Sequence, residues 1–190
     1  MPRPLPRQFC VEIDDREKKP LLFPEYIKLP TTSAGTAFVN VRITTKSTRM
    51  DAGDYRLQGY DYAGIERKSG QTELITNLTT NDYPRFYRAL CRFATTYEQP
   101  VLLIESTPSL LLAKPYLLPS SSAKGGLIDP AFLVHRLSEL TARLHLHLIL
   151  AGQSRSESQR RTLGTFMVHT LIGLSFLDIL GIQLDKPLEQ

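Results

Sequence analysis

The chain has 190 residues, of which 42% are hydrophobic and 22% charged, which is the composition of one globular domain with a substantial core. Its formal net charge of +4 suits a polyanionic partner without identifying one. No stretch reaches the roughly 18 to 20 apolar residues that span a bilayer, and the Pro- and Arg-rich start lacks the apolar run of a secretory signal. We therefore expect an intracellular protein, cytoplasmic or nuclear, that has no membrane segment.

The first predicted strand leads into a run of charge. Residues 1–8 include three prolines and two arginines, and we expect them to form a disordered arm ahead of a single domain over 9–190. Apolar and polar residues alternate over Phe9–Ile13, which predicts a strand, and six consecutive charged residues follow it. Leu21–Leu29 is apolar with two breaks and predicts a short helix or turn that ends at Pro30.

Three further strands are predicted downstream. β-branched residues alternate over Phe38–Thr45, and shorter strands are predicted at Gly53–Leu57 and Ile65–Lys68. We expect these strands to form an antiparallel meander that carries Asp54 and Glu66 on neighbouring strands.

Two helices are predicted next, a short one over Thr72–Leu78 and a longer one from about Asp82, where Pro84 suits the first turn. The longer helix has an apolar stripe and a separate basic stripe. The basic stripe consists of Arg85, Arg88 and Arg92, whose spacing places three guanidinium groups on one side of the helix. Two interpretations stay open, a solvated helix face or a ridge that contacts phosphate groups.

The second half of the chain predicts alternating strands and helices. Pro100–Glu105 is a short continuous apolar run, which predicts a buried, central parallel strand, and Leu144–Leu150 predicts another strand. The pair Asp129-Pro130 is typical of a helix start. The resulting order predicts an α/β domain with a mixed central sheet.

The end of the chain predicts a helix that closes the domain. A capping-box pattern at Ser154–Glu157 starts this helix, which we expect to run to about Thr170. Its expected inward residues are Leu163, Phe166 and Met167. The apolar segment Leu171–Leu180 closes the core or covers a partner chain, whereas residues 107–127 predict a long irregular loop with a flexible Ser- and Gly-rich part at 120–126.

An acidic and basic cluster provides the strongest candidate site. Glu66 and Lys68 share one strand face because side chains alternate with period two, and Asp54 lies on the predicted neighbouring strand. Two carboxylates can bind a hard divalent cation, and an adjacent ammonium can position water or offset charge on a phosphate. His145 and His147 lack an acid or Cys partner at metal spacing, and no Gly-rich phosphate loop predicts a nucleotide cofactor.

Three motifs in this order resemble the XPF-type nucleases, a family of structure-specific DNA endonucleases with a restriction-endonuclease-like fold. The motifs are Ile13-Asp14-Asp15-Arg16-Glu17, Gly53-Asp54-Tyr55 and Ile65-Glu66-Arg67-Lys68-Ser69. Arg85 and the Pro100–Glu105 strand also fit, so the resemblance covers roughly residues 9–170. The family's acid after Glu-Arg-Lys is usually Asp, whereas this chain has Glu73 one residue further along. The family's usual helix-hairpin-helix and helicase domains are not expected here.

The resemblance implies a mixed central sheet flanked by helices and a Mg²⁺-dependent endonuclease, with Mn²⁺ as a substitute, that cuts branched DNA in repair, recombination or replication. It also implies a homodimer or heterodimer. The implied metal ligands are Asp14, Asp54, Glu66 and the main-chain carbonyl of Arg67; Lys68 would orient the nucleophile, and Arg16, Glu17, Arg67 and Glu73 would support the site. Two alternatives stay open: a resolvase or restriction-like nuclease, and a non-catalytic DNA-binding scaffold.

Overall fold

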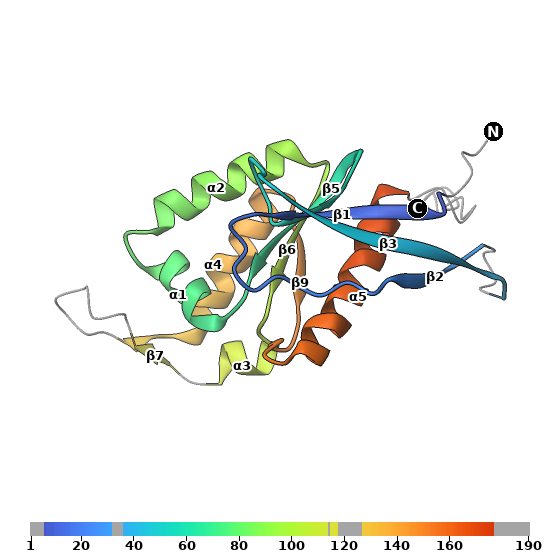
Figure 1. Ribbon diagram of the computed structural model, residues 1–190. Helices are drawn as coiled ribbons and strands as arrows, with labels where there is room; N and C mark the ends of the chain where they lie inside the picture. Colours follow the sequence, from blue (N-terminus) through green and yellow to red (C-terminus); the bar gives the residue numbers. More distant parts are fainter. Residues whose placement is uncertain (1–5, 32–35, 114, 118–126, 177–190) are drawn as a thin grey trace, which may run out of the picture.

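The computed structural model describes residues 6–31, 36–113, 115–117 and 127–176. In chain order the elements are β1 (Gln8–Asp14), β2 (Tyr26–Pro30), β3 (Phe38–Thr48), β4 (Tyr55–Leu57), β5 (Tyr60–Lys68), α1 (Gln71–Thr79), α2 (Tyr83–Thr96), β6 (Gln99–Ile104), α3 (Pro108–Leu112), β7 (Tyr116–Leu117), β8 (Leu127–Ile128), α4 (Pro130–Arg143), β9 (His147–Leu150) and α5 (Glu157–Ser175). Seven of the strands form one mixed sheet in the order β2-β3-β1-β4-β5-β6-β9 (Figure 1), and β7 pairs with β8 separately. This confirms the predicted α/β class with a mixed central sheet.

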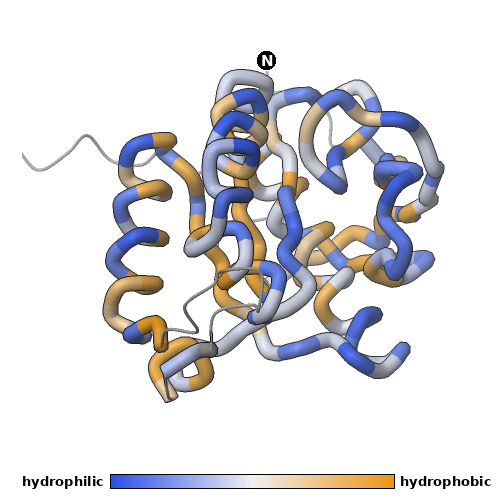
Figure 2. Tube along the Cα trace, turned by 90° about the vertical axis from the view of Figure 1, so that its left-hand side faces the viewer, coloured by the Kyte–Doolittle hydropathy of each residue, from blue (hydrophilic) through white to orange (hydrophobic). Residues whose placement is uncertain are grey.

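The sheet separates two apolar cores. On one face, the apolar residues of β1 to β6 pack against the buried side of α5. On the other face, α1, α2, α3 and α4 pack mainly against β6 (Figure 1). Hydrophilic and hydrophobic residues alternate along the helices in Figure 2, as expected for helices that bury one side against a sheet.

Strand β6 belongs to both cores. Its apolar residues are fully buried, with Val101 and Leu103 facing α5 and Leu102 and Ile104 facing α1 to α4. It pairs in parallel with β5 and with β9, which confirms the predicted buried parallel strand. Its position is not central, because β9 next to it is the last strand of the sheet.

The predicted meander forms only in part: β4 pairs antiparallel with β5, as expected, but β3 does not lie beside β4. Strand β3 pairs in parallel with β1 and antiparallel with β2, and β1 lies between β3 and β4. The segment expected to form a helix or turn includes β2, where buried Ile27 and Leu29 alternate with exposed Tyr26 and Lys28. This period-two pattern fits a strand, and pairing of β2 with β3 turns the chain so that β3 runs parallel to β1.

The helix starts agree with the sequence at α2 and α4 and differ at α5. Asp129 caps α4, because its carboxylate accepts a hydrogen bond from Ala131 N at 2.8 Å. The capping box of α5 consists of Ser156 and Gln159, two residues later than predicted. Phe166 was expected to point inward, but it lies on the solvent side of α5 and is 55% exposed, whereas Leu163 and Met167 are buried as predicted.

Several other elements begin or end at residues that differ from the predicted ones. Helix α5 continues to Ser175, and Leu171 and Ile172 are buried in this chain's own core rather than presented to a partner. The expected irregular loop contains α3 and β7, while its part at 120–126 lies outside the described residues, as do residues 1–5 and 177–180. Strand β1 begins at Gln8, inside the expected arm. Among the described helices, none combines the length and apolarity needed to cross a membrane.

Helix α5 approaches the connection between β1 and β2 closely at Gly164. A Cβ atom at this position would lie 2.2 Å from the carbonyl oxygen of Leu22. The backbone N–H of Leu22 also donates a hydrogen bond to Arg160 O at 3.4 Å. The absence of a side chain at Gly164 therefore lets the helix dock on this segment.

We expect Gly164→Ala to lower the free energy of unfolding by about 1 to 3 kcal/mol, because the added methyl group forces α5 away from Leu22. The matched control is Gly173→Ala in the same helix, where an added Cβ meets nothing within 4 Å. The control should leave stability unchanged or raise it by up to about 1 kcal/mol through helix propensity. Urea unfolding followed by circular dichroism measures both, and equal effects would contradict the close approach.

Candidate active site

The three charged motifs meet where the parallel strands β1, β5 and β6 end. The backbone N–H of Asp14, at the end of β1, donates to Asp54 O at 2.9 Å. The N–H of Asp54, just before β4, donates to Ile65 O in β5 at 2.7 Å. The N–H of Glu105, just after β6, donates to Lys68 O at 2.9 Å. Sheet topology therefore brings together residues that are far apart in the chain.

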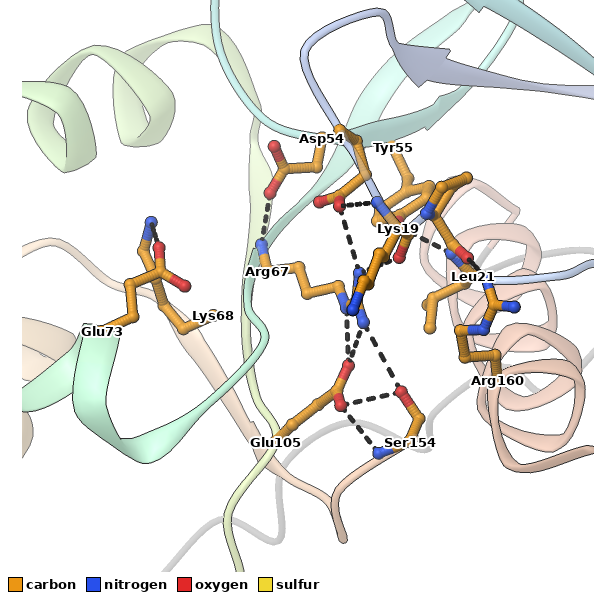
Figure 3. Close-up of polar contacts among 12 residues, drawn as sticks. Lys19, Leu21, Asp54, Tyr55, Arg67, Lys68, Glu73, Glu105, Ser154 and Arg160 are labelled. Carbon is orange, nitrogen blue, oxygen red and sulfur yellow. Dashed lines mark hydrogen bonds and ion pairs between the residues drawn. The ribbon is translucent and has the colours of Figure 1, made fainter. Parts of the chain in front are cut away.

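Asp54 and Glu66 form a pair of acids whose negative charge is not fully balanced by nearby positive groups. Asp54 is half-buried, and its carboxylate accepts a 2.7 Å hydrogen bond from the backbone N–H of Arg67 (Figure 3). Burial and the nearby negative charge of Glu66 together raise the pKa of Asp54 to about 7. A cation bound beside these two carboxylates would offset their repulsion and stabilise the ionised form of Asp54.

Lys68 lies on the same side of β5 as Glu66 and joins two acids. Its Nζ atom is 2.9 Å from Glu66 Oε1. The same atom is 3.3 Å from Oε1 of Glu73, which comes from the first turn of α1 (Figure 3). Burial alone would lower the pKa of Lys68, but the charges of Glu66 and Glu73 outweigh burial and raise it. Lys68 is therefore a fixed positive charge, and Glu73 reaches the predicted site.

Asp14, the predicted ligand of a metal or of metal-bound water, is held by hydrogen bonds from this chain. Its Oδ1 accepts hydrogen bonds from Arg16 N and Nε at 2.8 and 2.7 Å, and its Oδ2 accepts them from Arg16 Nη2 and Met50 N at 2.7 and 3.0 Å. The Arg16 side chain is the main cause that lowers the pKa of Asp14 to about 2. These four donors occupy both oxygens, so in this geometry Asp14 fixes the turn after β1.

Arg67 points to the opposite side of β5 and is buried. Its Nε donates to Glu105 Oε1 at 2.6 Å, and its Nη1 donates to the main-chain oxygen of Lys19 at 2.8 Å (Figure 3). Nη1 also lies 3.4 Å from Glu17 Oε1. The other oxygen of Glu105 accepts from Ser154 N and Oγ at 2.8 and 2.7 Å. The Arg67 guanidinium is therefore structural, and Glu17 adds a second negative charge beside it.

Sequence reasoning missed Ser154, and it separated Glu105 from the site motifs. Glu105 forms a buried ion pair with Arg67, and no motif in the sequence linked these two residues. Ser154 was assigned to a helix cap, yet its side chain binds Glu105. A buried acid directly after an apolar strand was the one available signal, because such a charge requires a partner.

The basic stripe on α2 is exposed, as either interpretation of it requires. Arg85, Arg88 and Arg92 face solvent, while Phe86, Leu90 and Phe93 are buried. The Nη2 atom of Arg85 is 3.8 Å from Asp82 Oδ1. Lys68 Nζ lies 5.3 Å from the ring centroid of Phe86, so the start of α2 adjoins the candidate site.

The buried pair of Arg67 and Glu105 provides a test of the site's framework. Arg67→Ala should lower the free energy of unfolding by about 3 to 5 kcal/mol, because it leaves the Glu105 carboxylate buried without its charge partner. The control Arg85→Ala removes an exposed guanidinium and should change stability by less than about 0.5 kcal/mol. Chemical denaturation compares the two variants, and similar losses would show that the ion pair does not stabilise the fold.

The raised pKa of Asp54 predicts how stability depends on pH. In the wild type, the unfolded carboxyl group ionises near pH 4 but the folded one near 7, so stability is lost as the pH rises through this window. Asp54→Asn removes this loss and keeps an oxygen for the Arg67 N–H. It should stabilise the protein by about 1 to 3 kcal/mol at pH 8 and leave stability near pH 4 unchanged.

Urea unfolding at pH 4, 6 and 8 measures this difference in the absence of divalent cations. The control Asp15→Asn changes an exposed carboxylate paired with Arg49 and should show no comparable pH dependence. A stability difference for Asp54→Asn that stays constant from pH 4 to 8 would contradict the assignment.

Comparisons with known proteins agree with this geometry at the level of the fold. No protein-family model matches the chain, and no curated protein sequence matches it. The solved structure of XPF from Aeropyrum pernix is similar, with a TM-score of 0.51, 17% sequence identity, 92% of this chain covered and 69% of that chain covered. XPF from Aeropyrum pernix in complex with DNA is similar with a TM-score of 0.52, 18% identity and coverages of 89% and 66%. The chain therefore has an XPF-type nuclease fold, a mixed seven-stranded sheet flanked by helices.

Proposed function

We propose that this protein is a metal-dependent endonuclease that hydrolyses phosphodiester bonds in branched DNA, such as flaps, forks or junctions. The observation that carries the proposal is the half-buried pair of acids Asp54 and Glu66, whose like charges repel, beside the fixed positive charge of Lys68. Such a combination of acids and ammonium is costly for stability and suited to a cation and a phosphate. Its position in an XPF-type nuclease fold, one example of which was solved in complex with DNA, supports DNA as the substrate.

Mg²⁺, or Mn²⁺ in its place, fits the donor set that these residues provide. Asp54 and Glu66 would bind the ion, with the main-chain carbonyl of Arg67 as a third ligand, because hard cations take oxygen ligands. Within the described residues no cluster of three or more His, Cys, Asp or Glu side chains forms a metal site. Mg²⁺ is usually bound by one or two carboxylates and keeps several waters. When bound, the ion supplies charge stabilisation and lowers the pKa of its water.

The other site residues position these groups and meet the phosphate. Lys68 carries the positive charge that offsets charge on the phosphoryl oxygens or orients the attacking water, and Glu73 keeps its ammonium in place. Arg67 holds Asp54 through its backbone N–H and anchors the strand end through Glu105. The exposed guanidinium groups of Arg85, Arg88 and Arg92 would contact the DNA backbone next to the site.

A second candidate is a non-catalytic DNA-binding subunit that keeps the nuclease fold. It is favoured by the contacts of two predicted catalytic acids, because Asp14 is saturated by hydrogen-bond donors and Glu66 is paired with Lys68. Pairing of two nuclease chains remains part of the proposal, and light scattering of the purified protein tests it.

Cleavage of labelled flap, fork, four-way junction and plain duplex DNA with Mg²⁺ or Mn²⁺ tests the function. Asp54→Asn and Glu66→Gln should each lower the cleavage rate by at least about 100-fold while binding of the same DNA, measured without metal, stays within about threefold. The control Asp15→Asn should cleave like the wild type, because this carboxylate is exposed and paired with Arg49.

Two outcomes would decide against the proposal. Wild-type protein that binds branched DNA but cuts none of the substrates with either ion would favour the scaffold. Unchanged cleavage by Asp54→Asn and Glu66→Gln would exclude these residues as the metal site. A further readout does not depend on activity: millimolar Mn²⁺ should raise the melting temperature of the wild type more than that of Asp54→Asn.

A further inference from the structure

Within the part of the chain that the structure describes, helices α1 to α4 cover only part of one sheet face. The core formed by α1 to α4 includes no residue of β1, β2 or β3, whereas the opposite face of these strands is covered by α5. Tyr97, which follows α2, packs against Gly64 in β5, so the helical cover reaches β5. The side chains of β2 and β3 on the uncovered face are therefore exposed, and we call this surface the open sheet face.

The open sheet face combines basic and aromatic side chains. Strand pairing places Tyr26 opposite Arg42 and Lys28 opposite Asn40, with Phe38 further along the same face. Tyr26 is 55% and Phe38 57% exposed, which is unusual for aromatic side chains on a sheet. Within the described residues, Lys28 and Arg42 make no ion pair, so their charges are available to a ligand.

Two further cations continue the surface towards β4. Lys46 and Arg56 lie on either side of the buried carboxylate of Glu12, at 3.9 and 2.7 Å. Asp61 pairs with Arg56 at 3.3 Å. Lys46 and Arg56 thus balance the two acids Glu12 and Asp61, and the excess positive charge of the surface comes from Lys28 and Arg42.

The open sheet face ends at the candidate active site. Strand β3 runs for about 33 Å from Phe38 to Thr48, at about 3.3 Å per residue, and Thr48 is the pairing partner of Asp14. Arg56 pairs with Gly64, so it shares its sheet face with Glu66 and Lys68, two and four residues further along β5. One continuous side of the sheet therefore leads from Phe38 to the candidate site.

We propose that the open sheet face binds a single-stranded DNA segment and leads it to the active site. This inference rests on the proposed function and adds to it the place where an unpaired arm of the branched DNA lies. Unstacked bases would lie on Tyr26 and Phe38, and the phosphates would meet Lys28, Arg42, Lys46 and Arg56.

The chemistry favours a single strand over duplex DNA or a protein. Aromatic rings offer stacking platforms to bases that are not already stacked in a duplex, and a basic surface follows the phosphate backbone. A protein partner for an exposed sheet face would need apolar area at the centre, but the residues between the two aromatics are polar or charged: Lys28, Asn40 and Arg42.

Fluorescence anisotropy of a labelled oligothymidine of about 20 nucleotides tests the proposal. The full chain carries Glu66→Gln and is kept in EDTA, so that cleavage plays no part. Lys28→Gln combined with Arg42→Gln should reduce the slope of log affinity against log salt by about 1.4, because each lost phosphate contact removes about 0.7. Tyr26→Ala combined with Phe38→Ala should weaken binding by at least about fivefold for each aromatic.

Matched controls lie on α5 and in the segment just before it, on the other side of the sheet. Arg155→Gln combined with Arg161→Gln removes the same charge from exposed positions, and Phe166→Ala removes an equally exposed aromatic ring. These variants should bind like the parent, and the conservative variants Arg42→Lys and Phe38→Tyr should keep most of the affinity. Circular dichroism verifies that each variant is folded.

Three results would overturn the proposal. The first is that variants of the open sheet face keep the affinity and the salt slope of the parent. The second is that the α5-side controls lose as much affinity as these variants. The third is a loss for duplex DNA as large as that for the single strand. Cleavage assays with Glu66 intact separate this inference from the proposed function. If variants of the open sheet face cut flaps as well as the wild type, the inference is refuted and the proposed nuclease stands. If these variants lose single-strand binding but the wild type shows no nuclease activity, the proposed nuclease is refuted and the inference stands.

Discussion

The arrangement of the candidate site depends on the buried guanidinium of Arg67. A charge this far from water requires compensation, and Glu105 provides it from the neighbouring strand end. Glu105 in turn binds Ser154, and Arg67 also binds the main chain at Lys19, so one ion pair joins four separate segments. Because side chains alternate along β5, the inward position of Arg67 directs Glu66 and Lys68 to the opposite face. Its backbone N–H meanwhile holds the Asp54 carboxylate.

The charges on the two sides of β5 differ in how far they are balanced. On the Arg67 side, the positive and negative groups pair closely and stabilise the fold. On the Glu66 side, three acids surround one ammonium, and burial makes ionisation of Asp54 unfavourable at neutral pH. An excess of partly desolvated negative charge is a usual feature of a site that binds a cation during its function. The same strand thus provides a rigid framework and a reactive surface.

The uneven cover of the sheet has consequences beyond stability. Helix α5 packs across strands β1 to β6, whereas the helices of the other face pack mainly on β6. The first half of the sheet consequently presents polar, basic and aromatic residues to solvent beside the candidate site. In our proposals, the single-stranded part of a branched substrate contacts the open sheet face, and the α2 surface contacts its phosphate backbone.

The sequence by itself determined the strands around the motifs, the helix starts near Asp82 and at Asp129-Pro130, and the shared face of Glu66 and Lys68, because alternation and capping are local properties of the chain. Only the tertiary structure decided that β1 lies between β3 and β4, since strand pairing depends on residues far apart in sequence. It also decided the contacts of Asp14, which is held by Met50 36 residues away, and of Glu105, which is held by Ser154 49 residues away. The tertiary structure also decided the pKa of Asp54, because burial and a neighbouring charge arise only when separate segments pack together.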